Sequence, residues 1–128
     1  MSAKIKRTNV AGTSPYEAVI GFSRAVRIGN VVHVSGTGPV GAEELSAAEQ
    51  TRVVLGLIEK ALRQAGATFE DVVRTRMYVV NIDQWEQVGR AHGEFFKDIR
   101  PATSMVEVSR LISPEIQVEI EADAVVQP

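Results

Sequence analysis

The sequence contains no cysteine, and this absence excludes disulfide bonds, thiolate nucleophiles and zinc sites built on cysteine. Its two histidines, His33 and His92, are too few for a dedicated metal site unless carboxylates contribute ligands. No glycine-rich phosphate loop follows an expected strand, and the spacing of serine, histidine and aspartate does not indicate a catalytic triad. We therefore expect a protein without a metal or another cofactor.

The sequence also lacks a strong charge of one sign and a long apolar run. The net charge is −2, and the only local basic group is Lys4, Lys6 and Arg7. Nucleic-acid binding needs a positive surface, and none is visible. No apolar run approaches the roughly 20 residues that cross a bilayer, and the N-terminus has no signal-peptide core. We expect a cytoplasmic protein that binds neither nucleic acid nor membrane.

The length and composition indicate one globular domain. The chain has 128 residues, and 45% of them are hydrophobic, which suffices for a core at this size. We expect a single domain over residues 1–128, in which residues 1–15 form a flexible or extended lead. This lead ends in the turn-rich segment Gly12–Pro15.

A hairpin is expected at the start of the domain. Residues Ala18–Ile28 have the composition of an extended segment, interrupted at Gly21, and Val31–Ser35 has that of a strand. Gly29 and Asn30 between them are typical of a tight turn.

The clearest helix signal begins at Ser46. Ser46 and Glu49 have the spacing of a capping box, and Gly66 is placed to end the helix. Between them one apolar stripe repeats at helical spacing: Val54, Leu57, Ile58, Ala61, Leu62 and Ala65. A second helix is expected from Asp83 until Pro101 breaks it or its exit loop, with Trp85, His92 and Phe95–Phe96 packed toward a sheet.

Three more strands are expected, at Val72–Val80, Thr103–Leu111 and Ile116–Val126. In the last of these, apolar residues alternate with Gln117, Glu119, Glu121 and Asp123, so one face meets helices and the other is polar.

The order β-β-α-β-α-β-β predicts an α+β fold in which two helices cover one face of a mixed sheet. If Thr103 starts the period of its strand, the opposite face is expected to carry Thr103, Met105, Glu107 and Ser109 together with Glu119 and Glu121. A sheet face that mixes apolar and acidic side chains is a candidate oligomer interface with polar pockets.

Three segments carry a resemblance to a known family. They are Arg100–Leu111 (RPATSMVEVSRL), Val118–Ala122 (VEIEA) and Val34–Gly36 followed by Pro39. Together they resemble the RidA/YjgF family, small trimeric proteins best known as enamine/imine deaminases. The resemblance implies a chorismate-mutase-like fold, a homotrimer with a central barrel, and clefts between neighbouring subunits that take a small molecule.

The resemblance also implies site residues. In the deaminating members an arginine that grips the substrate carboxylate follows the Pro-Ala pair, and here that position is Thr103. Glu119 matches the glutamate that positions the attacking water. The backbone carbonyl of Met105 and the aromatic ring of Phe22 match groups that shape the pocket. Ser35 either contacts the substrate or satisfies a turn.

Arg24 lies two residues beyond Phe22, on the same expected strand face. We hypothesise that it replaces the family arginine as the anion anchor; the alternative is an exposed or interface ion-pair residue. Three functions remain open. The first is enamine or imine hydrolysis with a rebuilt anion site, and the second is another hydrolysis of a substrate without the α-carboxylate. The third is a trimer that binds a metabolite or protein without catalysis. The acidic balance makes the older family label of translation inhibitor with ribonuclease activity the least supported.

Overall fold

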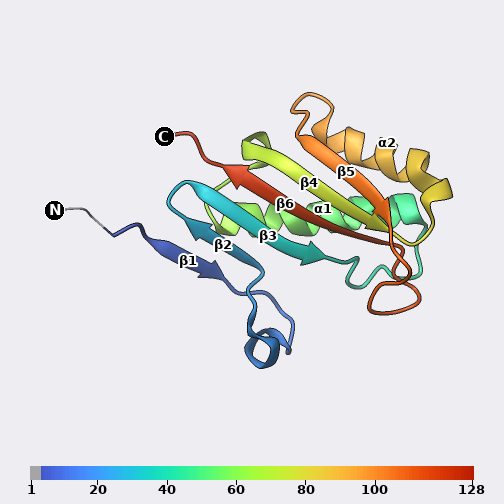
Figure 1. The fold of residues 1–128 in the computed structure, drawn as a ribbon, viewed down its shortest axis with the longest axis horizontal. Coiled ribbons are helices and arrows are strands. Elements are labelled where there is room, and N and C mark those ends of the chain that lie inside the picture. The colour runs from blue at the N-terminus through green and yellow to red at the C-terminus, as the bar shows by residue number, and fades with distance from the viewer. Residues whose placement is uncertain (1–3) are drawn as a thin grey trace.

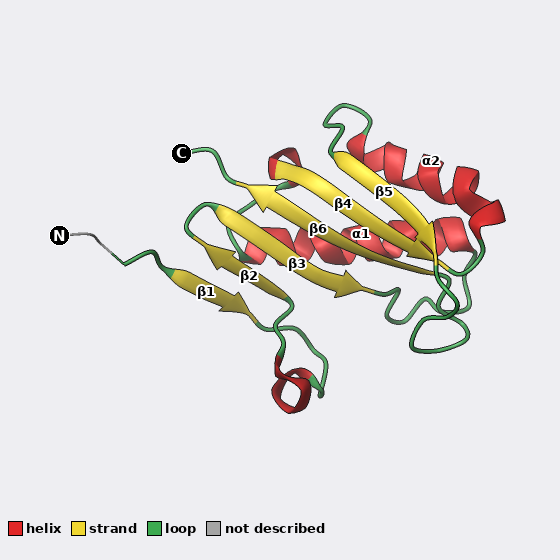
Figure 2. Cartoon of the chain, viewed as in Figure 1, coloured by secondary structure: helices red, strands yellow, loops and turns green. Residues whose placement is uncertain are grey.

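The computed structural model describes residues 4–128, which form one six-stranded sheet with two helices on one of its faces (Figure 1). The strands are β1 (Arg7–Val10), β2 (Ala25–Ile28), β3 (Val31–Thr37), β4 (Val72–Val79), β5 (Ala102–Glu107) and β6 (Val118–Val125). The helices are α1 (Ala47–Gln64) and α2 (Trp85–Phe96), with short helical turns at Glu17–Gly21, Phe69–Asp71 and Ile82–Gln84. The expected mixed sheet with helices on one face is confirmed, as Figure 2 also shows.

The order of strands across the sheet is β1-β2-β3-β6-β4-β5. Strands β4 and β5 are parallel, and the other neighbouring pairs are antiparallel. This order places β6 in the middle of the sheet, between β3 and β4. The polar side chains of β6 therefore have neighbours on both sides.

The core lies between the sheet and the helices. Val118, Ile120, Ala122 and Ala124 of β6 are fully buried, as the alternation in the sequence predicts. Helix α1 begins where expected, because the Ser46 side chain accepts a hydrogen bond from the Glu49 backbone N–H at 3.2 Å. Its buried stripe contacts the apolar face of β6.

The expected first strand is shorter than the sequence indicates. Residues Glu17–Gly21 form a single π-helical turn that ends at Gly21, whose φ of +87° suits glycine, and β2 begins only at Ala25. Within the expected lead, β1 pairs with β2 in antiparallel register, with Val10 opposite Ala25. The element order is therefore β-β-β-α-β-α-β-β.

The predicted orientation of β5 is wrong. In the parallel register of β4 and β5, Thr103 lies beside the fully buried Thr75, and Met105 lies beside the buried Met77. Thr103 and Met105 thus point to the helix-covered face, and Ser104 takes the opposite, open face. Strand β5 is an edge strand that is partly exposed on both faces, so its sequence has no clear apolar alternation.

Two further side chains differ from expectation. Glu107 is exposed near the end of β5, and its carboxylate accepts a hydrogen bond from the Ile82 backbone N–H at 3.1 Å. Trp85 is 59% exposed, so its predicted packing on the sheet is wrong. Helix α2 begins at Trp85, and the first buried residue of the helix, Val88, comes almost one turn later.

The fully buried Gln50 of α1 ties two loops to the helix. Its amide N–H groups donate to the carbonyls of Glu43 (2.9 Å), Leu45 (3.2 Å) and Glu115 (2.9 Å), and its carbonyl accepts from the Gln117 N–H at 2.8 Å. Gln50→Leu leaves these groups without their partner, so we expect the free energy of unfolding to fall by about 3 kcal/mol. Urea denaturation measures it, and Gln64→Leu, at an exposed position of the same helix, should change it by less than about 0.5 kcal/mol. Equal effects of the two substitutions would contradict this role of Gln50.

Candidate functional site

The open face of the sheet is polar and densely paired. Asp123 on β6 contacts Arg76 on β4 (Nη1 to Oδ2, 2.9 Å) and His33 on β3 (Nδ1 to Oδ1, 2.7 Å). The Tyr78 hydroxyl donates to Glu121 Oε1 at 2.8 Å. His33 is therefore an exposed residue with a carboxylate partner. Glu121 and Asp123 therefore each have a side-chain hydrogen-bond partner, whereas none is found for Glu119 at the start of the same strand within residues 4–128.

Glu119 lies against the backbone of Gly36 on β3. A Cβ atom at Gly36 would be 2.8 Å from Glu119 Oε2 and 3.0 Å from its Cδ, so the carboxylate occupies the space that a side chain would need. Burial raises the pKa of Glu119, the charge of Glu121 raises it further, and the charge of Arg24 opposes both. Glycine at position 36 thus permits a half-buried carboxylate whose pKa lies above its usual value.

Arg24 lies next to this carboxylate. Its Nη2 donates to the carbonyl oxygen of Gly36 at 2.7 Å, and its Nε is buried without a hydrogen-bond partner. Burial lowers the pKa of Arg24, whereas the charges of Glu17 and Glu119 raise it. The Arg24 guanidinium is therefore a half-buried cation that interacts electrostatically with two carboxylates, those of Glu17 and Glu119.

Glu17 is the residue of this cluster that the sequence analysis missed. Both of its carboxylate oxygens accept hydrogen bonds from the Gly12 backbone N–H, at 2.9 and 3.1 Å. Glu17 comes from the π-helical turn, which returns the chain toward Arg24. A signal was present in the sequence, since Glu17 is the only acidic residue before β2, but the sequence does not reveal the turn.

Ser35 is bonded to the chain segment that carries Arg24, and Phe22 precedes that segment. The Ser35 hydroxyl donates to the Ser23 carbonyl at 2.6 Å, and the Ser35 N–H donates to the Arg24 carbonyl at 3.0 Å. Ser35 therefore connects β3 to the segment before β2. Of the two roles expected for Ser35, this contact corresponds to satisfying backbone groups at a turn. Phe22 is half-buried in extended backbone directly after the π-helical turn.

Thr103 and Met105 lie apart from Glu119 and Arg24 in one chain. Their strand, β5, is separated from β6 by β4, and their side chains point to the opposite face of the sheet. Met105 packs at the border of the core, with its Cε 4.0 Å from the Cβ position of Gly89. A single copy thus brings Glu119 and Arg24 together, with Ser35 bonded to the Arg24 backbone, and it does not add Thr103 or Met105.

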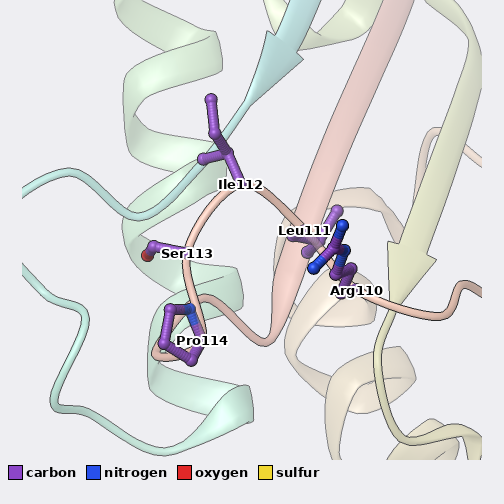
Figure 3. Close-up of a pocket in the computed structure, with 5 residues that line it drawn as sticks. All are labelled: Arg110, Leu111, Ile112, Ser113 and Pro114. Atoms are coloured by element: carbon purple, nitrogen blue, oxygen red, sulfur yellow. The ribbon is translucent and has the colours of Figure 1, made fainter.

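A surface hollow elsewhere does not coincide with these residues. It has a volume of about 540 Å³ and is lined by Arg110, Leu111, Ile112, Ser113 and Pro114 of the loop before β6 (Figure 3). Ile112 is 94% exposed, and the hollow contains no partnered carboxylate or histidine. The half-buried Glu119 carboxylate and Arg24 guanidinium therefore identify the candidate site better than the volume of this hollow does.

Within residues 4–128 no group of three or more histidine, aspartate or glutamate side chains is arranged to hold a metal ion. No helix in this part of the chain is both long and apolar enough to cross a membrane.

Comparisons with known proteins agree with the fold and the motifs. The family model for endoribonuclease L-PSP matches residues 12–126. An uncharacterized protein from Streptomyces coelicolor is 36% identical over 119 residues, which is 90% of this chain and 89% of that protein. The 2-iminobutanoate/2-iminopropanoate deaminase of Escherichia coli is 33% identical over 116 residues, covering 84% of this chain and 90% of the enzyme.

Solved structures agree as well. A crystal structure of a YjgF/YER057c/UK114 family member from Mycobacterium tuberculosis superimposes with a TM-score of 0.89. It is 55% identical in sequence and covers 94% of this chain and 100% of its own. The family model spans most of the chain, and relatives above 30% identity cover more than two thirds of it. The chain therefore belongs to the RidA/YjgF family, the family of the endoribonuclease L-PSP model.

Proposed function

We propose that this protein hydrolyses the C=N bond of a small imine, or of the enamine that tautomerises to it. One observation carries the proposal: the half-buried Glu119 carboxylate, set against the Gly36 backbone and beside the Arg24 guanidinium. The deaminase relative from Escherichia coli supports the reaction class, and the position of Glu119 in the VEIEA segment supports its role.

The reaction needs little from the protein beyond positioning. Ionised Glu119 accepts a hydrogen bond from a water molecule and takes its proton as the water oxygen bonds to the imine carbon. Protonated Glu119 returns this proton to the nitrogen and gives the carbinolamine. The hydroxyl proton of the carbinolamine then passes through Glu119 to the nitrogen as the C–N bond breaks, and ammonia leaves from the new carbonyl compound. An imine and one water molecule thus give one carbonyl compound and one ammonia. Holding the water against the imine carbon supplies much of the acceleration.

The substrate cleft is proposed to form between copies of this chain. Thr103 and Met105 lie two strands away from Glu119 and point to the other face of the sheet, so they do not reach a ligand at Glu119 of the same copy. A second copy that packs on the open face can place its own Thr103 and Met105 near that ligand. Val106 lies beside Tyr78 on the open face and is 46% exposed, so this face has apolar surface that an assembly would bury. A homotrimer is the proposed assembly.

Arg24 has two candidate roles, which differ in their measurable effects. If it anchors an anionic part of the substrate, Arg24→Gln should weaken the binding of anionic ligands. If it keeps Glu119 ionised, the substitution should shift the pH dependence of the reaction. The location of Arg24 between Glu17 and Glu119 supports the second role, and anion anchoring stays a prediction.

The pH profile tests this charge balance. Activity needs ionised Glu119, so it should rise with pH through the pKa of Glu119. Arg24 lowers this pKa and Glu121 raises it. We therefore expect the acidic limb of kcat/KM to move to higher pH in Arg24→Gln and to lower pH in Glu121→Gln. Shifts of both variants in the same direction would contradict the assignment of Glu119 as the titrating group.

The proposal is tested by ammonia release from enzymatically generated 2-aminoacrylate, with the native protein and its Thr103→Arg variant. Release above the buffer rate by the native protein supports the proposal even without the family arginine. Release by the variant alone means that the scaffold is competent and the native substrate lacks the α-carboxylate. Release by neither, with both proteins folded, counts against the proposed reaction.

A binding protein without catalysis is the second candidate. The observation that favours it is the Thr103 hydroxyl, which is engaged within the chain by Thr75 and the Pro101 carbonyl. Threonine supplies no positive charge at the position where the deaminases have arginine. This candidate predicts saturable binding of a small molecule with no ammonia release from any imine tested.

A further inference from the structure

A chain of hydrogen bonds crosses from helix α2 to the start of β5 and ends at Thr103. His92 Nε2 lies 3.0 Å from Thr75 Oγ1, and Thr75 Oγ1 lies 2.7 Å from Thr103 Oγ1. Thr103 Oγ1 lies 3.1 Å from the carbonyl oxygen of Pro101. His92 and Thr75 are buried, with exposed fractions of 9% and 0%, whereas Thr103 is exposed.

The donors and acceptors in this series of hydrogen bonds can be ordered in two directions, because each threonine hydroxyl has a single proton. In the outward direction His92 Nε2–H donates to Thr75, Thr75 donates to Thr103, and Thr103 donates to the Pro101 carbonyl. In the inward direction Thr103 donates to Thr75 and Thr75 donates to His92, so the Pro101 carbonyl receives nothing. The outward direction makes three hydrogen bonds and the inward direction makes two.

The surroundings agree with the outward direction. A carbonyl oxygen can only accept, so the contact between Thr103 and Pro101 is a hydrogen bond only when Thr103 donates. Burial lowers the pKa of His92, so its ring is neutral near pH 7 and has one proton to place. The outward direction places that proton on Nε2, where Thr75 accepts it.

This direction fixes what Thr103 offers to a ligand. Its only proton is committed to Pro101, and one of its two lone pairs is committed to Thr75, so one lone pair stays free. Arginine, which the deaminating relatives have at this position, offers five N–H donors and no acceptor. Residue 103 of this chain therefore presents a hydrogen-bond acceptor to the ligand, whereas the arginine of the deaminating relatives presents donors.

We infer that the ligand group that meets residue 103 is an uncharged hydrogen-bond donor, such as a carboxamide or amino N–H, in place of a carboxylate. The substrate class is then a small imine or enamine with a carboxamide or amine beside the C=N carbon. This substrate class narrows the proposed function. It rests on that function for one assumption, that the ligand reaches residue 103.

The charges at the candidate site favour the same class. Arg24 is the cation nearest to Glu119, and Glu17 and Glu119 together outweigh its charge by one. On the same face, Arg76 is paired with Asp123, whereas Arg74 donates to the neutral Ser104 hydroxyl at 2.8 Å and keeps its charge. At the Glu119 end a carboxylate on the ligand therefore meets no uncompensated cation, whereas an N–H group meets acceptors at Glu119 and at Thr103 Oγ1.

Pyruvate and pyruvamide provide the test, because they match in size and differ in carboxylate against carboxamide. With the native protein, titration calorimetry should give pyruvamide a dissociation constant about tenfold lower than that of pyruvate. Thr103→Val should reduce this preference to what the charges around Glu119 supply, because valine has the shape of threonine without the hydroxyl. Thr103→Ser keeps the hydroxyl and should retain the preference. Thr103→Arg should reverse it.

The results separate this inference from the proposed function. A preference for pyruvamide that Thr103→Val reduces and Thr103→Ser retains supports the inference, even if the protein hydrolyses no imine and the proposed function fails. Imine hydrolysis together with equal or tighter binding of pyruvate overturns the inference and leaves the proposed function standing. A pyruvamide preference that is undiminished in Thr103→Val, or no binding of either probe, also overturns it.

Discussion

Glu119→Gln is expected to lower the rate of imine hydrolysis by about 100-fold or more, because the amide cannot take a proton from the attacking water. Glutamine has nearly the same shape as glutamate, so it still fits against Gly36 and should leave the fold intact. The loss should appear in kcat when the initial rate of ammonia release is followed. Retention of more than about half of the native rate would remove Glu119 from the mechanism.

The same substitution should make the protein more stable at neutral pH. The pKa of Glu119 is raised in the folded state, so folding favours its protonated form. That contribution to stability is present below the unfolded pKa and is lost as pH rises through the folded pKa. The ionised carboxylate therefore destabilises the fold near pH 7, and glutamine removes this cost.

The melting temperature checks this second effect. It should be higher for Glu119→Gln than for the native protein at pH 7, and the difference should shrink as pH falls through the pKa of Glu119. Glu44→Gln, at an exposed position, provides a control that should change neither activity nor stability appreciably. A lower melting temperature for Glu119→Gln at pH 7 would mean that the carboxylate is a structural ion-pair residue.

Gly36→Ala is expected to lower kcat by about 10- to 100-fold although it removes no functional group. The new Cβ atom would meet Glu119 Oε2 at 2.8 Å and Cδ at 3.0 Å, so the carboxylate must move away from its place beside Arg24. The contacted atoms are the far end of a flexible side chain, and the backbone of Gly36 does not need a positive φ. The substitution should therefore displace the carboxylate at little expense in stability.

Gly38→Ala is the matched control, two residues further along the chain. Its Cβ atom would meet only Ile116 Cδ1 at 3.8 Å, an ordinary van der Waals contact. We expect nearly native activity from Gly38→Ala and a melting temperature close to native from both variants. Equal losses of activity in the two variants would indicate that the end of β3 is generally sensitive to substitution. The location of the Glu119 carboxylate would then be irrelevant to catalysis.

The sequence predicted those parts of the fold in which local chemistry and burial agree. The alternation in β6 located Glu119 on the polar face, because Val118 and Ile120 must be buried against α1. Ser46 marked the start of α1, because its side chain satisfies a backbone N–H that the first turn leaves open. These features depend on neighbouring residues, and a sequence displays them directly.

The sequence failed where the outcome depends on distant partners. Nothing in the residues of β5 distinguishes its two faces, so the facing of Thr103 is decided by its register with Thr75 on β4. The approach of Glu17 to Arg24 depends on a π-helical turn and on a bond to Gly12. The acceptor character of Thr103 depends on His92, and no spacing rule connects these two residues.

The central claim is that this chain accelerates the hydrolysis of a C=N bond through Glu119. The most direct measurement follows the hydrolysis of 2-iminopropanamide and 2-iminopropanoate, each released in situ, with native protein, with Glu119→Gln and in buffer alone. The account predicts acceleration by the native protein, greater for the carboxamide, and a rate near that of buffer for Glu119→Gln. A native rate equal to that of buffer for both imines, or equal acceleration by native protein and Glu119→Gln, would contradict the account.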